Sequence, residues 1–230
     1  MRAVKKKRTP DENSGKYHKD TFDKISDKKR ERIIKISTVE FAEKGFNGAN
    51  VNVIANKAGI SIGSMYNYFS SKEHLFLTVV DEGYKLLEAA FAGADLSNGD
   101  LFDKLETIIR VAQKHSRSHP HFVQLYQDIT TESLAHLSAR LSRKIENISA
   151  VFYRHYINEA REKGLVDPSI DEHVASYCID NIIVLMQFSY TSEYYKERLR
   201  TFVGEDALED DERVIKGMMD FIRHAIGARK

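Results

Sequence analysis

Residues 50–69 constrain the fold of this chain more than any other stretch, because they read as two short helices joined by a tight turn. Asn50 is placed to cap the first helix, since its side-chain oxygen can accept a free amide hydrogen two or three residues later. Gly59 stands where a left-handed residue ends a helix. Ser61 is placed to cap a second helix over residues 62–68. The stretch therefore predicts a helix-turn-helix, whose second helix can lie in a DNA major groove.

The same signals also occur in ordinary pairs of short helices inside an all-α core, so the flanking sequence has to separate the two interpretations. A helix is expected over residues 27–44, ended by Gly45. On the other side, Ser70 and Glu73 have the spacing of a capping box, which predicts a long helix from there to about residue 92. Three helices followed by a long fourth one favour the homeodomain-like kind of helix-turn-helix.

The rest of the chain also predicts helices. Three prolines and twelve glycines in 230 residues, with few alternating β-branched runs, favour an all-α protein. Ser169 and Glu172 read as another capping box. The expected later helices cover residues 101–117, 121–130, 132–163, 169–188 and 210–226.

Charge is distributed unevenly along the chain. Residues 1–80 hold 16 Lys and Arg against 9 Asp and Glu, whereas residues 81–230 hold 19 against 25. A basic module joined to an acidic remainder is typical of nucleic-acid binding, although a solvated basic tail would give the same asymmetry. The single cysteine excludes an internal disulfide, and no apolar run is long enough to span a membrane. We expect a cytoplasmic protein with no membrane partner.

Three segments in fixed order carry a family resemblance: FAEKGF, then IANKAGIS, then SMYNYFSSKEHLF. Over residues 27–78 the chain resembles the TetR family of one-component bacterial transcriptional regulators. The resemblance implies a helix-turn-helix DNA-binding domain over residues 21–71. The preceding residues 1–20 are polar, charged and without periodicity, which predicts a disordered basic tail. The resemblance also implies a larger helical domain over residues 72–230, which dimerises through its last two helices and binds a small-molecule effector of unknown identity.

The matching residues have side chains suited to double-stranded DNA. Tyr66 offers a hydroxyl and Lys72 a charge to phosphates, while Asn67 can pair with adenine through two hydrogen bonds. Gly63 allows close approach, and Ile62 replaces the lysine that is common in the family. The full set expected to contact DNA is Asn52, Ser61, Ile62, Gly63, Ser64, Tyr66, Asn67, Tyr68 and Lys72. For Tyr68, core packing and phosphate contact remain equally open, whereas Met65 and Phe69 are expected to point inward.

The second domain offers weaker signals. Most of its aromatic residues will be core, and from these Tyr126, Tyr156 and Tyr177 are chosen as candidates to line an effector pocket between helices. The resemblance implies a dimer interface on the apolar last two helices, and the residues expected there are Ile183, Met186, Met218 and Ile222.

No motif for an enzyme, metal or cofactor is convincing. His115 and His119 in HSRSHPH are four residues apart, as in some metal sites, but Pro120 interrupts the helix and no acidic partner is adjacent. Cys178 is expected to be a small core residue. We therefore expect no metal, no cofactor and no catalytic residues.

These observations together predict a DNA-binding transcriptional regulator, in the family's usual manner a repressor that binds a near-palindromic operator as a homodimer and is released by its effector. One alternative is a ligand-independent DNA-binding protein that acts through protein contacts of its C-terminal domain. Another is a helical ligand-binding protein or enzyme whose helix pair never meets DNA.

Overall fold

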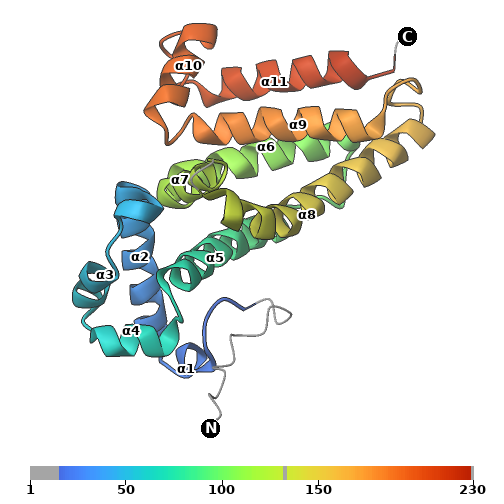
Figure 1. The fold of residues 1–230 in the computed structure, drawn as a ribbon. Helices are drawn as coiled ribbons and strands as arrows, with labels where there is room; N and C mark the ends of the chain where they lie inside the picture. Colours follow the sequence, from blue (N-terminus) through green and yellow to red (C-terminus); the bar gives the residue numbers. More distant parts are fainter. Residues whose placement is uncertain (1–15, 132–133, 229–230) are drawn as a thin grey trace. The chain divides into compact units, whose positions relative to one another are not determined.

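A computed structural model describes residues 16–131 and 134–228, and Figure 1 shows that the elements are all helices. In these residues the only β-type pairing is an isolated bridge between Val166 and Gly227. The all-α class expected from the sequence is confirmed. The helices are α1 (Asp20–Asp23), α2 (Asp27–Gly48), α3 (Val51–Ala58), α4 (Ile62–Tyr68), α5 (Lys72–Ala92), α6 (Leu101–Ser118), α7 (Pro120–Ile129), α8 (Ala135–Glu162), α9 (Glu172–Phe188), α10 (Glu193–Val203) and α11 (Asp211–Ile226).

The chain forms two compact units that divide between Gly83 and Tyr84, at a position within α5. Most of the basic tail expected over residues 1–20 lies outside the described residues, and α1 already begins at Asp20. The expected start of the long helix at Glu132 also lies outside them. No described helix combines the length and the apolar character that crossing a membrane requires.

The first unit is built around aromatic and branched side chains from α1 to α5. Phe41 packs edge to face on Phe76 with ring centroids 5.1 Å apart, which ties α2 to α5. The regular part of α2 ends at Gly45, whose φ of 66° favours glycine, so the expected stop is confirmed. The largest fully buried side chains of this unit are Phe22, Ile33, Phe41, Ile54, Met65, Phe69, Leu75, Phe76 and Leu77.

Two helix starts differ from the expected capping boxes by one or two residues. At α5 the hydroxyl of Ser71, not that of Ser70, accepts the amide hydrogen of His74, with 3.2 Å between the heavy atoms. At α9 the carboxylate of Asp171, not the hydroxyl of Ser169, accepts amide hydrogens from the first turn. In both places several residues that can cap a helix follow one another in the sequence. The spacing of residues alone did not show which of them accepts the free amide hydrogens of the first helical turn.

The second unit packs α6 against α8, α9 and α11 around one hydrophobic core. Helices α8 and α9 form its most extensive helix pair. Helix α10, which the sequence analysis missed, has no buried residue. Core residues from α6, α8, α9 and α11 include Leu105, Ile109, Ile157, Ile179, Ile183, Met186, Ile215, Met219 and Ile222.

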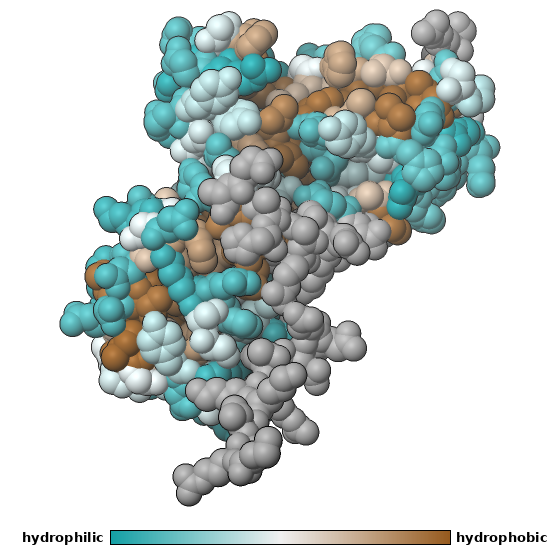
Figure 2. Space-filling view, in the orientation of Figure 1, coloured by the Kyte–Doolittle hydropathy of each residue, from teal (hydrophilic) through white to brown (hydrophobic). Residues whose placement is uncertain are grey.

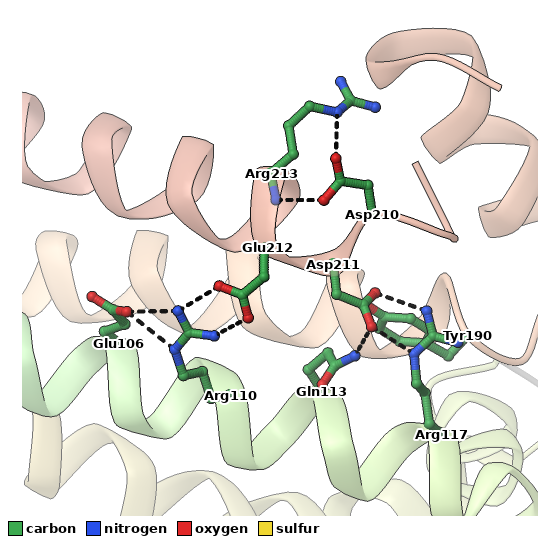
Figure 3. A network of polar contacts seen from close by, with 9 residues as sticks. All are labelled: Glu106, Arg110, Gln113, Arg117, Tyr190, Asp210, Asp211, Glu212 and Arg213. Atoms are coloured by element: carbon green, nitrogen blue, oxygen red, sulfur yellow. Dashed lines mark hydrogen bonds and ion pairs between the residues drawn. The ribbon is translucent and has the colours of Figure 1, made fainter. Parts of the chain in front are cut away.

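A polar network joins α6 to the start of α11 (Figure 3). The carboxylate of Asp211 accepts hydrogen bonds from the guanidinium of Arg117 at 2.8 and 2.9 Å, from the Tyr190 hydroxyl at 2.8 Å and from the Gln113 amide. One helical turn away, Arg110 lies between Glu106 and Glu212. Hydrogen bonds to these carboxylates raise the pKa of both arginines. The network therefore holds the N-terminal turn of α11, the last helix, against α6.

Candidate functional site

The α3–turn–α4 segment has the caps that its sequence predicts. The side-chain oxygen of Asn50 accepts the amide hydrogen of Asn52 at 2.9 Å, and the Ser61 hydroxyl accepts that of Ser64 at 3.1 Å. Gly59 adopts the left-handed conformation with φ 68° and ψ 37°, and the next amide, of Ile60, donates to the Ala55 carbonyl. These local hydrogen bonds satisfy backbone amide groups at the starts of α3 and α4 and a carbonyl group near the end of α3. The conformation of the turn between the two helices is therefore fixed by neighbouring residues.

Helix α4 has one buried side and one exposed side. Met65 is 1% exposed and, as expected, faces the core, as does Phe69 just after the helix. On the other side Tyr66 is 49% and Ile62 38% exposed, and Asn67 is exposed as well. A short helix that presents a tyrosine hydroxyl, an amide and an apolar side chain to solvent can contact both a phosphate backbone and base edges.

Gly63 lies on the exposed side of α4, and the fold does not require glycine there. A Cβ built at this position would meet only the Ser61 hydroxyl, at an ordinary 3.8 Å, and its φ is not in the left-handed region. Internal packing therefore does not explain the missing side chain.

The C-terminal end of α4 is held by α1, a feature that the sequence analysis did not identify. The Lys19 ammonium donates to the Tyr66 carbonyl at 2.7 Å, and the Thr21 hydroxyl donates to the Asn67 carbonyl at 2.5 Å. Phe22 is 1% exposed and its ring centroid lies 4.7 Å from that of Phe69. Helix α1 therefore satisfies the last carbonyl groups of α4 and anchors it to the core.

Helix α3 is tied to α2 by a buried carboxylate. Glu40 is 5% exposed, and its two oxygens accept the Asn50 amide hydrogen at 3.3 Å and an ion pair from Lys57 at 3.1 Å. Arg32 donates to the Lys57 carbonyl at 3.2 Å. Glu40 and Arg32 of α2 thus both contact α3 directly. Sequence analysis missed this pair because Glu40 lies 17 positions from Lys57 in an otherwise unremarkable charged stretch.

Two of the residues expected to contact DNA are engaged within the protein. Tyr68 is only 7% exposed, packs on Phe22, and its hydroxyl accepts a hydrogen bond from Lys29 at 3.1 Å. This favours core packing, so we remove Tyr68 from the candidate contacts. The Lys72 ammonium donates to the Asn47 carbonyl at 3.0 Å, and partial burial lowers its pKa.

The remaining candidates of the first unit stay accessible to different degrees. Asn52 and Ser61 are exposed, whereas Ser64 is half-buried. The hydroxyls of Ser61 and Ser64 lie 2.9 Å apart and share a hydrogen bond. Ser61 therefore acts first as a helix cap, and only its remaining hydrogen-bonding capacity is available to another molecule.

The three tyrosines expected to line a pocket lie in different surroundings. Tyr126 is half-buried and donates to a carboxylate oxygen of Glu146 at 2.9 Å. Tyr156 is half-buried under the Lys104 ammonium, which lies 4.4 Å from its ring centroid. Tyr177 is 70% exposed on α9. A side chain in that position does not line an interior pocket, so the expectation for Tyr177 needs correction.

The residues expected at a dimer interface are mostly covered by the chain itself. Ile183, Met186 and Ile222 are 4%, 2% and 2% exposed and belong to the core of the second unit, while Met218 is half-buried. Little of their side-chain surface is therefore accessible to a second copy of the chain. The exposed apolar residues of α9 and α11 are Val174, Tyr177, Leu185 and Phe221.

The histidines of HSRSHPH form a stacked pair. The rings of His115 and His119 lie 4.7 Å apart, and burial lowers the pKa of His115 to about 4, with the nearby His119 acting in the same direction. Among the described residues no group of three or more His, Cys, Asp or Glu could hold a metal. Cys178 is exposed rather than part of the core.

Comparisons with known proteins agree with this geometry. A sequence model of the bacterial regulatory proteins of the tetR family matches residues 33–79. The chain is similar to the HTH-type transcriptional repressor NicS of Pseudomonas putida, with 29% identity over 186 residues that span 79% of this chain and 83% of that protein. It is also similar to YerO of Bacillus subtilis, an uncharacterized HTH-type transcriptional regulator, with 34% identity over 77% of this chain and 62% of that protein.

A solved structure of a TetR family transcriptional regulator from Chloroflexus aurantiacus has the same fold, with a TM-score of 0.69 at 21% identity over 92% of this chain and 99% of that one. Regulators of this kind are not enzymes, in agreement with the expectation from the sequence. The family match spans α3, the turn and α4, the segment whose outer side is exposed. The chain therefore belongs to the TetR family of DNA-binding transcriptional regulators.

Proposed function

We propose that this regulator is a repressor which binds a near-palindromic operator as a homodimer and leaves it when a small-molecule effector binds the second unit. The observation that carries the DNA-binding part is the exposed side of α4, where Tyr66 and Asn67 flank a helix whose opposite side is buried. Within residues 21–71, the proposed DNA-binding domain, α4 is the recognition helix.

The exposed residues have separate roles in this proposal. Tyr66 contacts a phosphate and adds affinity on any sequence, whereas Asn67 reads a base edge and adds specificity. Asn52 on α3 and Ser64 on α4 supply further polar contacts, and Ile62 can meet a thymine methyl group. Lys72 supports the site by holding the Asn47 carbonyl and reaches a phosphate only if that bond opens.

Gly63 provides a test that separates DNA binding from folding. Gly63→Ala should leave the unfolding midpoint unchanged or raise stability by about 0.4–1 kcal/mol, because alanine restricts the unfolded chain and nothing in the fold opposes a Cβ there. It should weaken operator binding at least about tenfold if α4 approaches the duplex closely. Fluorescence anisotropy on DNA footprinted upstream of the protein's own gene measures the affinity.

Gly93→Ala is the matched control, since its Cβ would also meet only ordinary contacts and it lies in the second unit. Equal affinities for Gly63→Ala and Gly93→Ala would contradict close approach of α4. Tyr66→Phe should weaken binding to all sequences alike, whereas Asn67→Ala should cost about 1–3 kcal/mol at one base position. The same loss of discrimination in both would contradict the assigned roles.

The homodimer is supported by apolar side chains that the chain leaves exposed on α9 and α11. Val174, Tyr177 and Leu185 recur on one side of α9, and Phe221 is 65% exposed on α11. Figure 2 shows apolar residues gathered over these two helices of the second unit. Contiguous apolar surface of this kind is typical of protein interfaces, and identical surfaces on two copies can pair about a two-fold axis.

Phe221→Glu should convert dimers to monomers without loss of helicity, as measured by analytical ultracentrifugation and circular dichroism. Phe202→Glu is the control, because Phe202 is 75% exposed on α10, outside the proposed interface. A monomeric wild type, or dimers that persist equally in both variants, would contradict the interface on α9 and α11.

A further inference from the structure

The last three carbonyl groups of α4 each accept a hydrogen bond from the start of α1. Every helix leaves the carbonyl groups of its final turn without partners in the helix itself. The Lys19 ammonium donates to the Tyr66 carbonyl at 2.7 Å. The Thr21 hydroxyl donates to the Asn67 carbonyl at 2.5 Å. The backbone amide of Lys19 donates to the Tyr68 carbonyl at 2.9 Å. We call these three hydrogen bonds the α1–α4 contacts.

Two of the α1–α4 contacts hold the peptide groups on either side of the Asn67 Cα atom. A peptide group is planar, so a hydrogen bond to its carbonyl restrains the whole group. The Tyr66 carbonyl belongs to the group before this Cα atom, and the Asn67 carbonyl belongs to the group after it. Helix α4 has only seven residues, too few to be stable without contacts to the rest of the protein. Helix α1 therefore fixes the direction in which the Asn67 side chain leaves the backbone.

Helix α1 has other anchors besides these hydrogen bonds. Phe22 is 1% exposed, and its ring centroid lies 4.7 Å from that of Phe69 and 5.8 Å from that of Tyr68. The Asp23 carboxylate pairs with the Arg30 guanidinium of α2 at 3.8 Å. Removal of one hydroxyl or one ammonium group from residues 19–21 should therefore leave α1 in place and change only how the end of α4 is held.

Lys19 and Thr21 have surroundings that suit a supporting role. Both side chains are half-buried, whereas Tyr66 and Asn67 are exposed. The Lys19 ammonium lies at the C-terminal end of α4, where the helix dipole favours a positive charge. A contact from this ammonium to a DNA phosphate would compete with its bond to the Tyr66 carbonyl. Positioning of α4 and phosphate contact are therefore separable roles for Lys19.

We propose that Lys19 and Thr21 are positioning residues for base recognition, which orient Asn67 through the α1–α4 contacts and do not contact a base themselves. The inference rests on the proposed function, in which Asn67 reads a base edge. Two hydrogen bonds from an Asn side chain to one base require the amide to lie in line with that base. Loss of an α1–α4 contact should therefore lower discrimination at one base pair more than it lowers affinity for unrelated DNA.

Thr21→Val and Thr21→Ser form a matched pair, because valine keeps the shape of threonine without the hydroxyl and serine keeps the hydroxyl. Fluorescence anisotropy compares the operator with an operator changed at the base pair where Asn67→Ala loses discrimination. Thr21→Val should lower this discrimination at least about threefold, and Thr21→Ser should retain the wild-type value. Thr38→Val is the control, since it removes a hydroxyl that donates to the Ile34 carbonyl within α2. Wild-type discrimination in Thr21→Val, or an equal loss in Thr38→Val, would overturn the proposal.

A double variant separates positioning of Asn67 from a general weakening of α4. If Thr21 acts through Asn67, adding Thr21→Val to Asn67→Ala should change operator affinity less than about twofold, because the oriented side chain is already gone. Losses of affinity that add up in the double variant would show that Thr21 acts on α4 as a whole, and would contradict the proposal.

Lys19→Met removes the ammonium group and keeps a long unbranched side chain. Positioning predicts a loss of discrimination of at least about threefold at the same base pair, with an unchanged slope of log affinity against log salt concentration. A phosphate contact would instead reduce that slope by about one and leave discrimination intact, which would refute the positioning role of Lys19. Far-UV circular dichroism checks that each variant is folded, and Lys19→Met carries the test if Thr21→Val does not fold.

The wild type distinguishes failure of this inference from failure of the proposed function. If the wild type binds the footprinted operator no more tightly than unrelated DNA, the proposed function fails and positioning by α1 fails with it. If the wild type discriminates and both Thr21→Val and Lys19→Met discriminate equally well, the proposed function stands and only positioning by α1 fails.

Discussion

Replacing the partly buried carboxyl of Asp180 by an amide should stabilise the protein at neutral pH. In the folded chain the pKa of Asp180 is raised to about 6 by burial and by Glu146, whereas an aspartate in an unfolded chain titrates near 4. Ionising this group is therefore harder in the folded state. The wild type loses stability as the pH rises from about 4 through 6, and Asp180→Asn does not.

The size of the effect follows from the difference between the two pKa values. Two units correspond to about 3 kcal/mol at a pH above both. Because Asp180 is only partly shielded from water, a realistic gain for Asp180→Asn at about pH 7.5 is about 1–2 kcal/mol. Near pH 4 most of the gain should disappear, since the wild-type carboxyl is then largely protonated in both states.

Urea unfolding followed by far-UV circular dichroism at about pH 7.5, 6 and 4 measures the difference. The chain contains no tryptophan, so the helix signal is the practical probe. Glu162→Gln, an exposed acid on α8, should show no such pH-dependent gain. A gain of equal size at all three pH values, or destabilisation at pH 7.5, would show that the pKa of Asp180 is not raised in the folded protein.

Two further predictions concern the second unit. Asp211→Ala should destabilise the protein by about 2–3 kcal/mol, because it removes the acceptor shared by Arg117, Tyr190 and Gln113. Asp220→Ala, at an exposed position on α11, is the control. A urea unfolding midpoint of Asp211→Ala no lower than that of Asp220→Ala would contradict the prediction. The pKa of His115, lowered to about 4 against about 6.5 unfolded, predicts that stability falls as the pH drops from 6.5 to 4, by at most about 3 kcal/mol. Comparing Asp180→Asn with Asp180→Asn/His115→Gln isolates this effect, and parallel pH profiles of the two would refute it.

The local structure of the first unit could be predicted well from the sequence. The caps at Asn50 and Ser61 and the stop at Gly59 depend on neighbours within four residues, and the structure confirms all three. The orientation of Met65 followed from the spacing of apolar residues along α4. Tyr68 could not be assigned in the same way, because its ring is buried by Phe22, which lies 46 positions earlier in the chain.

The second unit was harder for the same physical reason. Helix α9 is apolar on nearly every side, so periodicity could not separate the residues that face the chain's own core, such as Ile183, from those left exposed, such as Tyr177. Helix α10 is short and has no buried residue, so its partly exposed apolar side chains were not recognised as a separate helix after α9. Tyr126, Glu146, Tyr153 and Asp180 are 7 to 54 positions apart in the chain, and only the packing of α7, α8 and α9 brings them near one another.

The bonds from Lys19 and Thr21 to the end of α4 have an evolutionary consequence. Residues 19–22 hold the end of α4, the proposed recognition helix, without belonging to it, so substitutions there should change operator preference indirectly while the proposed base-reading side chains are kept. Among descendants of a duplicated regulator gene, positions 19–22 should therefore diverge together with positions 66–69. Lineages that acquire a new target site can then preserve the helix-turn-helix motif itself and still change what it recognises.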